Sequence, residues 1–293
     1  MRAWVIGNVA LDETVAVADL PAPGASIHGR VMACDLGGKG ANQAIVLGRA
    51  GLICRLGAAV GDDPRAAEIR ARLAAEPVGL RLLAIPGAAS DFSIVLMAGT
   101  GDNAIITTRD AASAISPEAA IAMLAGAEAG DLLVLQGNLS QATTMAVLQH
   151  SRALRLRTAL NPSPLREFFG DIWPLVDTAF VNEGEAAALG GTAALLSAGV
   201  ARVVLTLGPA GAHLISAEGA AEVPAVPCTV VDTTGAGDCF MATALASAAL
   251  RGVALDSRAL RHGAMAAAIT VSRPGTLTAL PSSRELAGIL TQD

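Results

Sequence analysis

Short apolar runs alternate with segments of helical spacing along most of the chain, from about residue 50 onward. Residues 132–136 form a continuous apolar run, which is typical of a strand buried on both faces, and residues 140–154 follow with helical spacing. Further strand-like runs, each near an alanine-rich helical stretch, lie at residues 158–161, 178–181 and 202–207. This alternation predicts an α/β fold with a mostly parallel sheet that is covered by helices on both faces.

Both ends of the chain extend this scheme. Residues 1–7 predict a first strand that ends in a glycine turn. Two short runs at 212–216 and 221–223 predict an antiparallel hairpin at the margin of the sheet, and residues 238–250 and 257–272 predict two helices. Because no linker interrupts the pattern, we expect the chain of 293 residues to form a single domain.

Two segments do not fit the alternation. Residues 12–36 contain short alternating runs broken by the sequence PAPG, and residues 92–109 contain two strand-like runs separated by a turn at 99–103. Together they predict a small second sheet that lies over a cleft as a lid. The alternative is an extension of the main sheet at its edge. Since proteins usually cover exposed edge strands, the lid sheets also predict a homodimer.

The composition and the N-terminal residues bear on where in the cell the protein is found. Hydrophobic residues make up 53% of the chain and the mean hydropathy is +0.53, but alanine accounts for much of this value. No stretch reaches the roughly 18 continuous apolar residues that a membrane span needs. The N-terminal residues also lack the apolar region of a signal peptide. We therefore expect a soluble, cytoplasmic protein with no membrane partner.

The charge and the aromatic content bear on possible partners. The net charge is −6, no basic run is present, and only 2% of the residues are aromatic. Nucleic acid is therefore not an expected partner, because phosphates attract basic surfaces and unpaired bases stack on aromatic rings. The four cysteines show no C-x-x-C spacing and the four histidines are scattered, so we expect reduced thiols and no zinc site.

The strongest chemical signal is the sequence DTTGAGDCF at residues 232–240, which continues into an apolar stretch at residues 241–250. Glycines before the start of a helix leave backbone N–H groups free to bind an anion. Asp238 would place a carboxylate beside that anion. This arrangement suits a general base that takes a proton from an attacking hydroxyl during phosphoryl transfer. The alternative is a glycine-rich turn in which Asp238 is the helix N-cap.

A second glycine cluster, GGKGANQ at residues 37–43, precedes an apolar helical run at residues 44–50. It is not a Walker A loop, because Gly40 stands where Ser or Thr should follow the lysine. Glycines let a backbone approach a ligand closely. Lys39 and Asn42 offer a charge and an amide that are suited to sugar hydroxyls. The alternative is a tight strand-to-helix turn.

The two clusters, in this order, resemble the signatures of the ribokinase (PfkB) family of sugar and nucleoside kinases, and the likeness covers essentially the whole chain. Between them, VNEGE at residues 181–185 resembles the N-x-x-E motif of the family, and LTLG at residues 205–208 with Gly211 resembles its nucleotide-binding turn. The resemblance implies a three-layer α/β/α fold with a mostly parallel central sheet and a small β-sheet lid. It also implies ATP-dependent transfer of the γ-phosphoryl group to a primary hydroxyl of a small sugar.

The resemblance implies a role for each motif residue. Asp238 would be the general base, and the anion hole would be formed by the backbone amides of Gly235, Ala236 and Gly237. The residues that hold the sugar would be Asp12, Gly38, Lys39 and Asn42. Those that contact ATP would be Thr206, Gly208, Gly211 and Gly237. The phosphates and Mg²⁺ would be bound by Asn182 and Glu185, with Glu185 reaching the metal through water.

A potassium site is implied as well. The positions that line a monovalent cation in ribokinases match Asp232, Thr234, Thr270, Arg273 and Gly275. The cation would order the loop that forms the anion hole. The expected ligands of the protein are therefore a small sugar, ATP, Mg²⁺ and K⁺.

Two positions depart from the ribokinase pattern. Ala10 replaces an asparagine two residues before the sugar-binding aspartate, and Asn138 replaces a glutamate that follows the strand at 132–136. Losing a hydrogen bond to a buried polar group typically costs about 1–3 kcal/mol, so we expect the substrate to be held differently from ribose in a typical ribokinase. Arg109, at the end of the lid hairpin, would meet a carboxylate, phosphate or sulfonate on the substrate, or would lie solvated at the rim.

Other functions compete with that of a simple sugar kinase. Within the same family, the substrate could be a ketose, a sugar acid or a nucleoside, and the low aromatic content argues against a stacked base. A non-catalytic sugar or nucleotide sensor would have no need for a base such as Asp238 beside an anion hole. A dehydrogenase would need an early G-x-G-x-x-G after a strand, which this chain lacks.

Overall fold

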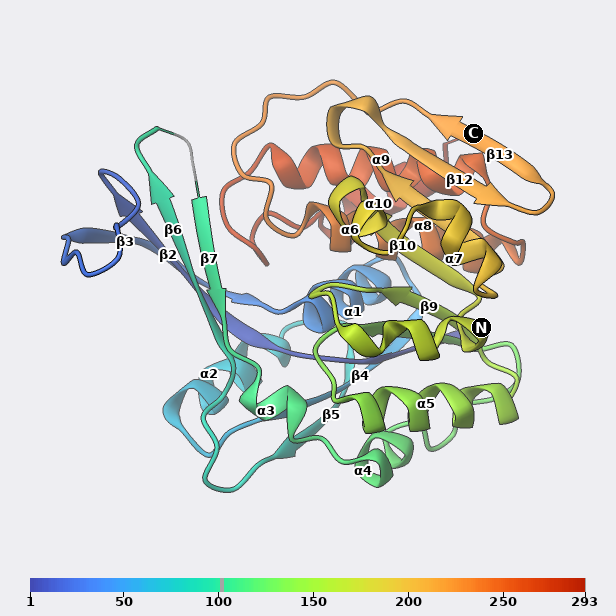
Figure 1. Ribbon diagram of the computed structural model, residues 1–293, viewed down its shortest axis with the longest axis horizontal. Helices are drawn as coiled ribbons and strands as arrows, with labels where there is room; N and C mark the ends of the chain where they lie inside the picture. The colour runs from blue at the N-terminus through green and yellow to red at the C-terminus, as the bar shows by residue number, and fades with distance from the viewer. Residues whose placement is uncertain (101–102, 293) are drawn as a thin grey trace.

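One large sheet organises the molecule in a computed structural model that describes residues 1–100 and 103–292. Its strands are β1 (Arg2–Ile6), β4 (Ile53–Val60), β5 (Gly79–Ala84), β8 (Leu132–Gln136), β9 (Arg157–Asn161), β10 (Thr178–Asn182), β11 (Arg202–Thr206), β12 (Ala212–Ser216) and β13 (Gly219–Val223). Within the described residues they lie in the order β13-β12-β11-β10-β9-β8-β1-β4-β5 (Figure 1). Neighbours from β5 to β11 pair in parallel, and β12 and β13 add an antiparallel hairpin. The predicted parallel sheet with a marginal hairpin is confirmed.

Helices cover both faces of this sheet. The helices that contribute to the core on one face are α1 (Lys39–Arg49), α2 (Pro64–Leu73), α8 (Ala236–Arg251), α9 (Ser257–Val271) and α10 (Ser283–Leu290). Those on the other are α3 (Asp110–Ser113), α4 (Pro117–Ala122), α5 (Gln141–Ala153), α6 (Glu183–Ala188) and α7 (Thr192–Ser197), with the 3₁₀ segments η1 (Glu167–Asp171) and η2 (Trp173–Leu175). Among the described residues, no helix is both long enough and apolar enough to cross a bilayer.

The central strands explain why the fold has three layers. Along β1, Ala3 and Val5 belong to one buried cluster, whereas Trp4 and Ile6 belong to the other. Successive side chains of a strand point to opposite faces, so a strand that is apolar at every position must be covered on both sides. β8 follows the same rule. The predicted three-layer α/β/α architecture is therefore built around these continuous apolar strands.

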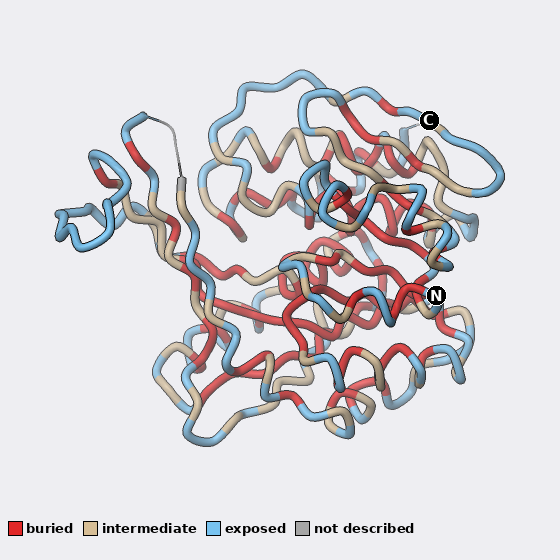
Figure 2. The backbone as a smooth tube through the Cα atoms, viewed as in Figure 1, coloured by how far each residue is buried: buried red, intermediate tan, exposed pale blue. Residues whose placement is uncertain are grey.

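A second, smaller sheet stands apart from the first. Its strands are β2 (Ala10–Val17), β3 (Gly29–Gly37), β6 (Phe92–Ala98) and β7 (Asn103–Thr107), in the order β3-β2-β6-β7. Figure 1 shows it projecting from one side of the molecule. Its outer ends are mostly exposed, and its base is buried (Figure 2). The prediction of a second sheet is confirmed, and the alternative of an edge extension is wrong. Residues 101–102 of the predicted turn lie outside the described residues.

The starts of two helices differ from the sequence-based expectation. α1 begins at Lys39 instead of residue 44, and α8 begins at Ala236 instead of Asp238. Both helices follow a glycine with a positive φ, Gly38 and Gly235, which ends the preceding loop abruptly. Apolar spacing marks where a helix buries a face, but caps decide where it begins, so spacing alone places the starts too late.

Helix α10 was not predicted, although the sequence contains its signal. Ser282 accepts the Glu285 N–H with its hydroxyl, and the Glu285 carboxylate accepts the Ser282 N–H, which together form a capping box. Leu286 and Ile289 then bury one face of a short helix. A serine followed three residues later by a glutamate before apolar positions is the known sequence signature of such a helix start.

Candidate active site

A cavity of about 930 Å³ opens at the carboxyl ends of the parallel strands. Ligands of open α/β sheets bind outside these strand ends. The lining includes the last residues of β9, β10 and β11, which are Asn161, Asn182 and Thr206. The predicted site residues that line the cavity are Lys39, Asn182, Glu185, Thr206, Gly208, Gly211, Gly235, Ala236, Gly237 and Asp238. The structure therefore brings both glycine clusters and both intervening motifs to one place.

The remaining predicted substrate residues do not line this cavity. Asp12 lies on β2 at the base of the small sheet, Gly38 and Asn42 lie at the start of α1, and Asn138 follows β8. Asn42 donates a hydrogen bond to Asp238. Asp12, Asn42 and Asn138 are all buried. Arg109 is exposed immediately before α3 and does not belong to the cavity lining either, a position that fits the alternative of a rim arginine.

The glycines of residues 37–43 allow α1 to begin against the turn that follows β1. Gly38 has a φ of +92°, and a methyl group added there would lie 2.8 Å from the Cα atom of Val9. Asn8 caps the helix, because its side-chain oxygen accepts the Gly40 N–H over 3.2 Å and its carbonyl accepts the next N–H of the helix over 3.0 Å. These first-turn amides are paired and are not available to a phosphate, in contrast to those of a P-loop.

The N-terminal turn of α8 faces the cavity. Gly235 is its N-cap in the left-handed region, with φ +75° and ψ −5°, so the alternative that Asp238 is the N-cap is wrong. Asp238 instead lies within the first turn and is only 5% exposed. Of the amides expected to bind an anion, the Ala236 N–H donates to the carbonyl of Thr233 over 3.3 Å, and Gly237 is exposed in the cavity lining.

Side-chain amides fix the orientation of the Asp238 carboxylate. Asn42 Nδ2 donates to its Oδ2 over 3.1 Å, and Gln43 Nε2 donates to its Oδ1 over 2.8 Å. Gln136 Nε2 donates in turn to Gln43 Oε1 over 2.6 Å. Sequence reasoning assigned no role to Gln43 or Gln136. The signal that could have found Gln136 is its position as the polar end of an otherwise apolar strand.

Four buried acceptor oxygens at the base of the small sheet, the start of α1 and the end of β8 have no hydrogen-bond partner among the described residues. They are Asp12 Oδ1, Asn42 Oδ1, Gln136 Oε1 and Asn138 Oδ1. A buried polar atom left without a partner destabilises a protein by about 1–3 kcal/mol, so a group of them indicates a ligand site. Because all four are acceptors, they match a ligand that offers several O–H donors, as a sugar does.

Asp12 is the charged member of this group and lies on β2 with 8% of its surface exposed. Burial raises the pKa of its carboxyl, hydrogen bonds from Ser93 and Thr276 oppose the rise, and the charges of Asp35 and Asp238 add to it. The Thr276 hydroxyl donates to Oδ2 over 3.2 Å. Asp12 therefore takes up a proton at a higher pH than an ordinary aspartate.

The opposite half of the site is shaped by the ends of β10 and β11. Asn182 and Glu185 form a capping box at the start of α6, in which the Asn182 side chain accepts the Glu185 N–H over 2.8 Å. Glu185 Oε2 accepts the Asn182 N–H over 3.0 Å. After β11, Gly211 has a φ of +99°, and a methyl group there would come within 2.1 Å of the Val223 carbonyl oxygen. The glycine is thus required for the turn beside the cavity.

The residues expected around a monovalent cation come from two segments that pair with each other, because the Asp232 N–H donates to the Val271 carbonyl over 3.2 Å. Asp232 accepts the Thr234 N–H over 2.9 Å and the Gly275 N–H over 3.3 Å. The Thr270 hydroxyl bonds within its own helix, and the Arg273 guanidinium is held in an ion pair. In the part of the chain that the structure describes, no group of three or more His, Cys, Asp or Glu side chains could hold a metal ion.

These features define a class of protein. A buried carboxylate in the first turn of a helix, beside a cavity and hydrogen-bonded to Asn42, which carries one of the unpaired acceptor oxygens, fits the active site of an α/β phosphotransferase. The sequence profile of the pfkB family carbohydrate kinases matches residues 4–283. The chain therefore belongs to the pfkB family of carbohydrate kinases, and the sequence-based prediction of the family and of its kinase activity is confirmed.

Individual relatives are similar over their whole length. Ribokinase of Bacillus subtilis is 28% identical over 290 residues, which cover 98% of each protein. The solved structure of ribokinase from Thermotoga maritima has a TM-score of 0.87 at 25% identity and covers 100% of both chains. That of ribokinase from Cryptococcus neoformans var. grubii in complex with ADP has a TM-score of 0.84 at 25% identity, with coverage of 98% of this chain and 99% of that one. The ribokinase-like fold thus extends over the entire chain.

Proposed function

We propose that this protein is an ATP-dependent, ribokinase-like kinase that phosphorylates a primary hydroxyl of a small sugar. The observation that carries the proposal is the position of Asp238, which is buried at the start of α8 and fixed by Asn42 and Gln43. A sugar in the acceptor pocket and a phosphoryl group at the helix N-terminus would meet at this carboxylate, which is the geometry that general-base catalysis needs.

In the proposed reaction, Asp238 accepts the proton of the sugar hydroxyl while the hydroxyl oxygen attacks the γ-phosphorus of ATP. The new P–O bond forms as the bond between the γ-phosphorus and the β,γ-bridging oxygen breaks, and ADP leaves with that oxygen. The amides of Gly235 and Gly237, together with the dipole of α8, would stabilise the negative charge on the transferred group, and the Ala236 amide would join them by giving up its 3.3 Å hydrogen bond to the Thr233 carbonyl. Lys39 lines the same cavity and would add a positive charge to it.

ATP is the proposed donor, and Mg²⁺ is the proposed metal. The cavity of about 930 Å³ has the size of a nucleotide site, and the Cryptococcus ribokinase was solved with ADP. Glu185 lines the cavity and uses Oε2 in its capping box, which leaves Oε1 to accept from a water of a hydrated Mg²⁺. We place the protein in the cytoplasm, where ATP is available and where its four free cysteines stay reduced.

Potassium is proposed to order the anion-hole loop. The support is that Asp232 joins Thr234 and Gly275 by hydrogen bonds directly before the anion-hole segment, so a cation on nearby main-chain carbonyls would stiffen that loop. Activity should therefore be higher in potassium chloride than in tetramethylammonium chloride at the same ionic strength. Equal rates in the two salts would remove potassium from the proposal.

The small sheet is proposed to act as a lid and to form the interface of a homodimer. Its edge strands β3 and β7 carry exposed apolar side chains, with Val31 at 66%, Ile105 at 53% and Ile106 at 61% exposed. Exposed apolar side chains on an unpaired sheet edge mark a surface that proteins cover. Sedimentation should show a dimer at micromolar concentration, and a purely monomeric protein there would refute this part of the proposal.

The substrate is tested by an assay of ADP release across pentoses, hexoses, sugar acids and nucleosides. Because Ala10 offers no polar group and Asn138 offers a neutral amide, ribose should be used, but a related sugar should be better by about tenfold, or 1.4 kcal/mol. A substrate with an anionic group should rank above its neutral counterpart only if Arg109 contacts the substrate instead of lying solvated at the rim. No ADP release with any sugar would overturn the function, and ribose ranking first would show that the two departures are neutral.

A further inference from the structure

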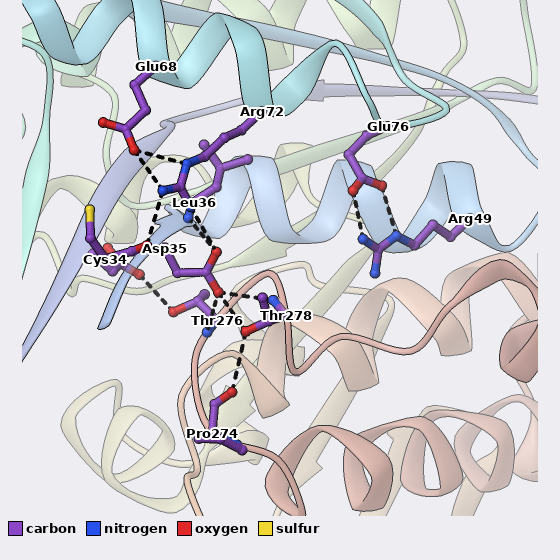
Figure 3. A network of polar contacts seen from close by, with 11 residues as sticks. Cys34, Asp35, Leu36, Arg49, Glu68, Arg72, Glu76, Pro274, Thr276 and Thr278 are labelled. Carbon is purple, nitrogen blue, oxygen red and sulfur yellow. Dashed lines mark hydrogen bonds and ion pairs between the residues drawn. The ribbon is translucent and has the colours of Figure 1, made fainter. Parts of the chain in front are cut away.

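Two buried carboxylates, Asp35 on β3 and Asp238 on α8, are held by different kinds of donors. Asp35 accepts the main-chain N–H groups of Thr276 and Thr278 over 3.2 and 3.0 Å, besides other donors (Figure 3). The Asp238 side chain accepts, within the described residues, from two side-chain amides. A main-chain N–H has a direction that the fold sets, whereas a side-chain amide can turn and present its oxygen instead of its nitrogen. The orientation of Asp238 therefore depends on what holds these two amides.

The two amides, those of Asn42 and Gln43, differ in how their own oxygens are held. Asn42 Oδ1 is buried and has no partner among the described residues. Gln43 Oε1 accepts Gln136 Nε2 over 2.6 Å. The hydrogen bonds from Gln136 to Gln43 and from Gln43 to Asp238 thus run in one direction, toward the carboxylate. Gln43 is the amide whose orientation a second side chain sets.

Packing leaves Gln136 little room to move. It is the last residue of β8, and Gln136 and Gln43 are 1% and 0% exposed. A methyl group added at Gly7, which follows β1, would lie 1.9 Å from Gln136 Oε1 and 3.2 Å from the Cα atom of Gly40. The Gln136 amide therefore fills the space beside a glycine of the neighbouring strand end. The sheet and the start of α1 fix the direction in which Gln136 donates.

This contact matters most when Asp238 changes its charge. While the carboxylate is ionised it only accepts, so it attracts the amide nitrogen of Gln43 without further help. Once Asp238 has taken the proton of a sugar hydroxyl, it also carries an O–H donor that an amide oxygen could accept. Turning the Gln43 oxygen toward Asp238 would break its hydrogen bond from Gln136 and set two amide nitrogens against each other. Gln43 therefore stays a donor before and after the proton transfer.

We propose that Gln136 is a positioning residue for phosphoryl transfer, whose amide nitrogen acts on Asp238 through Gln43. This inference rests on the sugar kinase activity proposed above. By keeping Gln43 a donor, Gln136 holds the base in one orientation toward the attacking hydroxyl, and such orientation contributes to the rate of the chemical step. Loss of the Gln136 donor should therefore lower kcat and leave the KM for sugar and the KM for ATP unchanged.

Gln136→Met tests this role, because it removes the donor at similar volume. With the best sugar of the panel, kcat should fall by about twofold to fivefold, and no further than in Gln43→Leu. Gln136→Leu removes the same donor with a different side chain and should give the same loss. Leu135→Met is the matched control, since it changes an apolar contact at the same strand end and no hydrogen bond of the three side chains. Its kcat should be that of the wild type.

A double variant shows whether Gln136 acts through Gln43. In Gln43→Leu no amide is left for Gln136 to orient, so adding Gln136→Met should lower kcat no further than Gln43→Leu alone. Two residues that act independently would instead give a loss equal to the product of the two single losses. That product would overturn the proposed action through Gln43.

The other outcomes separate this inference from the proposed function. A folded Gln136→Met enzyme, verified by thermal unfolding, that keeps the wild-type kcat would overturn the role of Gln136. A raised KM for sugar with an unchanged kcat would overturn it as well, because Gln136 would then bind the substrate instead of positioning the base. A wild-type enzyme that phosphorylates no sugar would overturn the proposed function.

Discussion

The sugar half and the nucleotide half of the cleft meet at Asp238 but are lined by different kinds of atoms. On the sugar side, the unpaired acceptor oxygens belong to side chains that are at most 8% exposed. On the nucleotide side, the lining is rich in glycine and in apolar side chains such as Pro227, Val230 and Ala268. The first half offers a few oriented oxygens to its ligand, and the second offers shape and main-chain groups.

Because of this difference, the two halves should respond differently to amino-acid substitutions. A buried acceptor that loses its partner costs about 1–3 kcal/mol, because no solvent replaces the lost hydrogen bond. An apolar contact between two atoms contributes only about 0.1–0.2 kcal/mol, and a ligand makes many of them. Substitutions on the sugar side should therefore alter the KM for sugar sharply, whereas single substitutions on the nucleotide side should alter the KM for ATP little.

The largest effect is expected at the residue that both halves share. Asp238→Asn should lower kcat by roughly 10²–10⁴-fold, because the amide cannot take the proton of the sugar hydroxyl. Sugar and ATP should still bind, which calorimetry with each ligand separately can measure. Near-normal turnover in this variant would show that Asp238 is not the base. The sugar and the phosphoryl group would then not react at this carboxylate.

The second-largest effect is expected on sugar binding alone and distinguishes the sugar half from the nucleotide half. Asp12→Asn should raise the KM for sugar roughly tenfold to a hundredfold, since a charge-assisted hydrogen bond contributes about 1.5–3 kcal/mol, and should leave the KM for ATP unchanged. Val230→Ala, on the nucleotide side, is the matched control and should leave the KM for sugar unchanged. A parallel rise of both constants in Asp12→Asn would contradict the comparison.

The charge of Asp12 also makes sugar binding depend on pH. Burial, the first cause, raises the pKa of this carboxyl above its ordinary value of 3.8. The ionised form accepts sugar hydroxyls, so the KM for sugar should rise as the pH falls through this raised pKa, above the range of an ordinary aspartate. In Asp12→Asn the dependence should vanish. A wild-type KM that stays constant from neutral pH down to the ordinary range would refute the role of the ionised carboxylate.

A smaller effect is expected from the amide that orients the base. Gln43→Leu removes the donor to Asp238 Oδ1 at similar volume and should lower kcat by about fivefold with little change in the KM for sugar, because one net hydrogen bond contributes about 1 kcal/mol. Single-turnover kinetics would locate the loss in the chemical step. A loss confined to the KM for sugar would instead make Gln43 a substrate-binding residue.

The smallest effect is expected where Glu185 acts through water. Glu185→Gln removes a charge beside the cavity and should increase the Mg²⁺ concentration needed for half-maximal rate by a few-fold, since Mg²⁺ keeps several of its own waters. A magnesium titration at fixed ATP measures this change. An unchanged titration would show that Glu185 does not act on Mg²⁺ and only caps α6 together with Asn182.

Much of the fold and half of the site followed from local patterns. The apolar run of residues 132–136 predicted a buried strand, and DTTGAGD predicted a glycine turn before a helix, although α8 begins at Ala236 and not at the predicted Asp238. These predictions were correct because they depend on local features: the alternation of side chains along a strand and the conformation of a glycine turn are both set by residues only a few positions apart. The start of α1 was placed too late, because Asn8, which caps it, belongs to a different strand end.

The sequence by itself determined which residue types carry the chemistry and which elements hold them. The tertiary structure alone decided which partners those residues have, because these contacts join positions far apart in the chain. Gln43 and Asp238 are 195 residues apart, and Thr276 and Asp12 are 264 residues apart. A hydrogen bond needs its atoms to lie within a few tenths of an ångström of the right distance, and only the packing of strands and helices sets that distance. For this reason Asp12 could be recognised from sequence, whereas its hydrogen bond from the Thr276 hydroxyl could not.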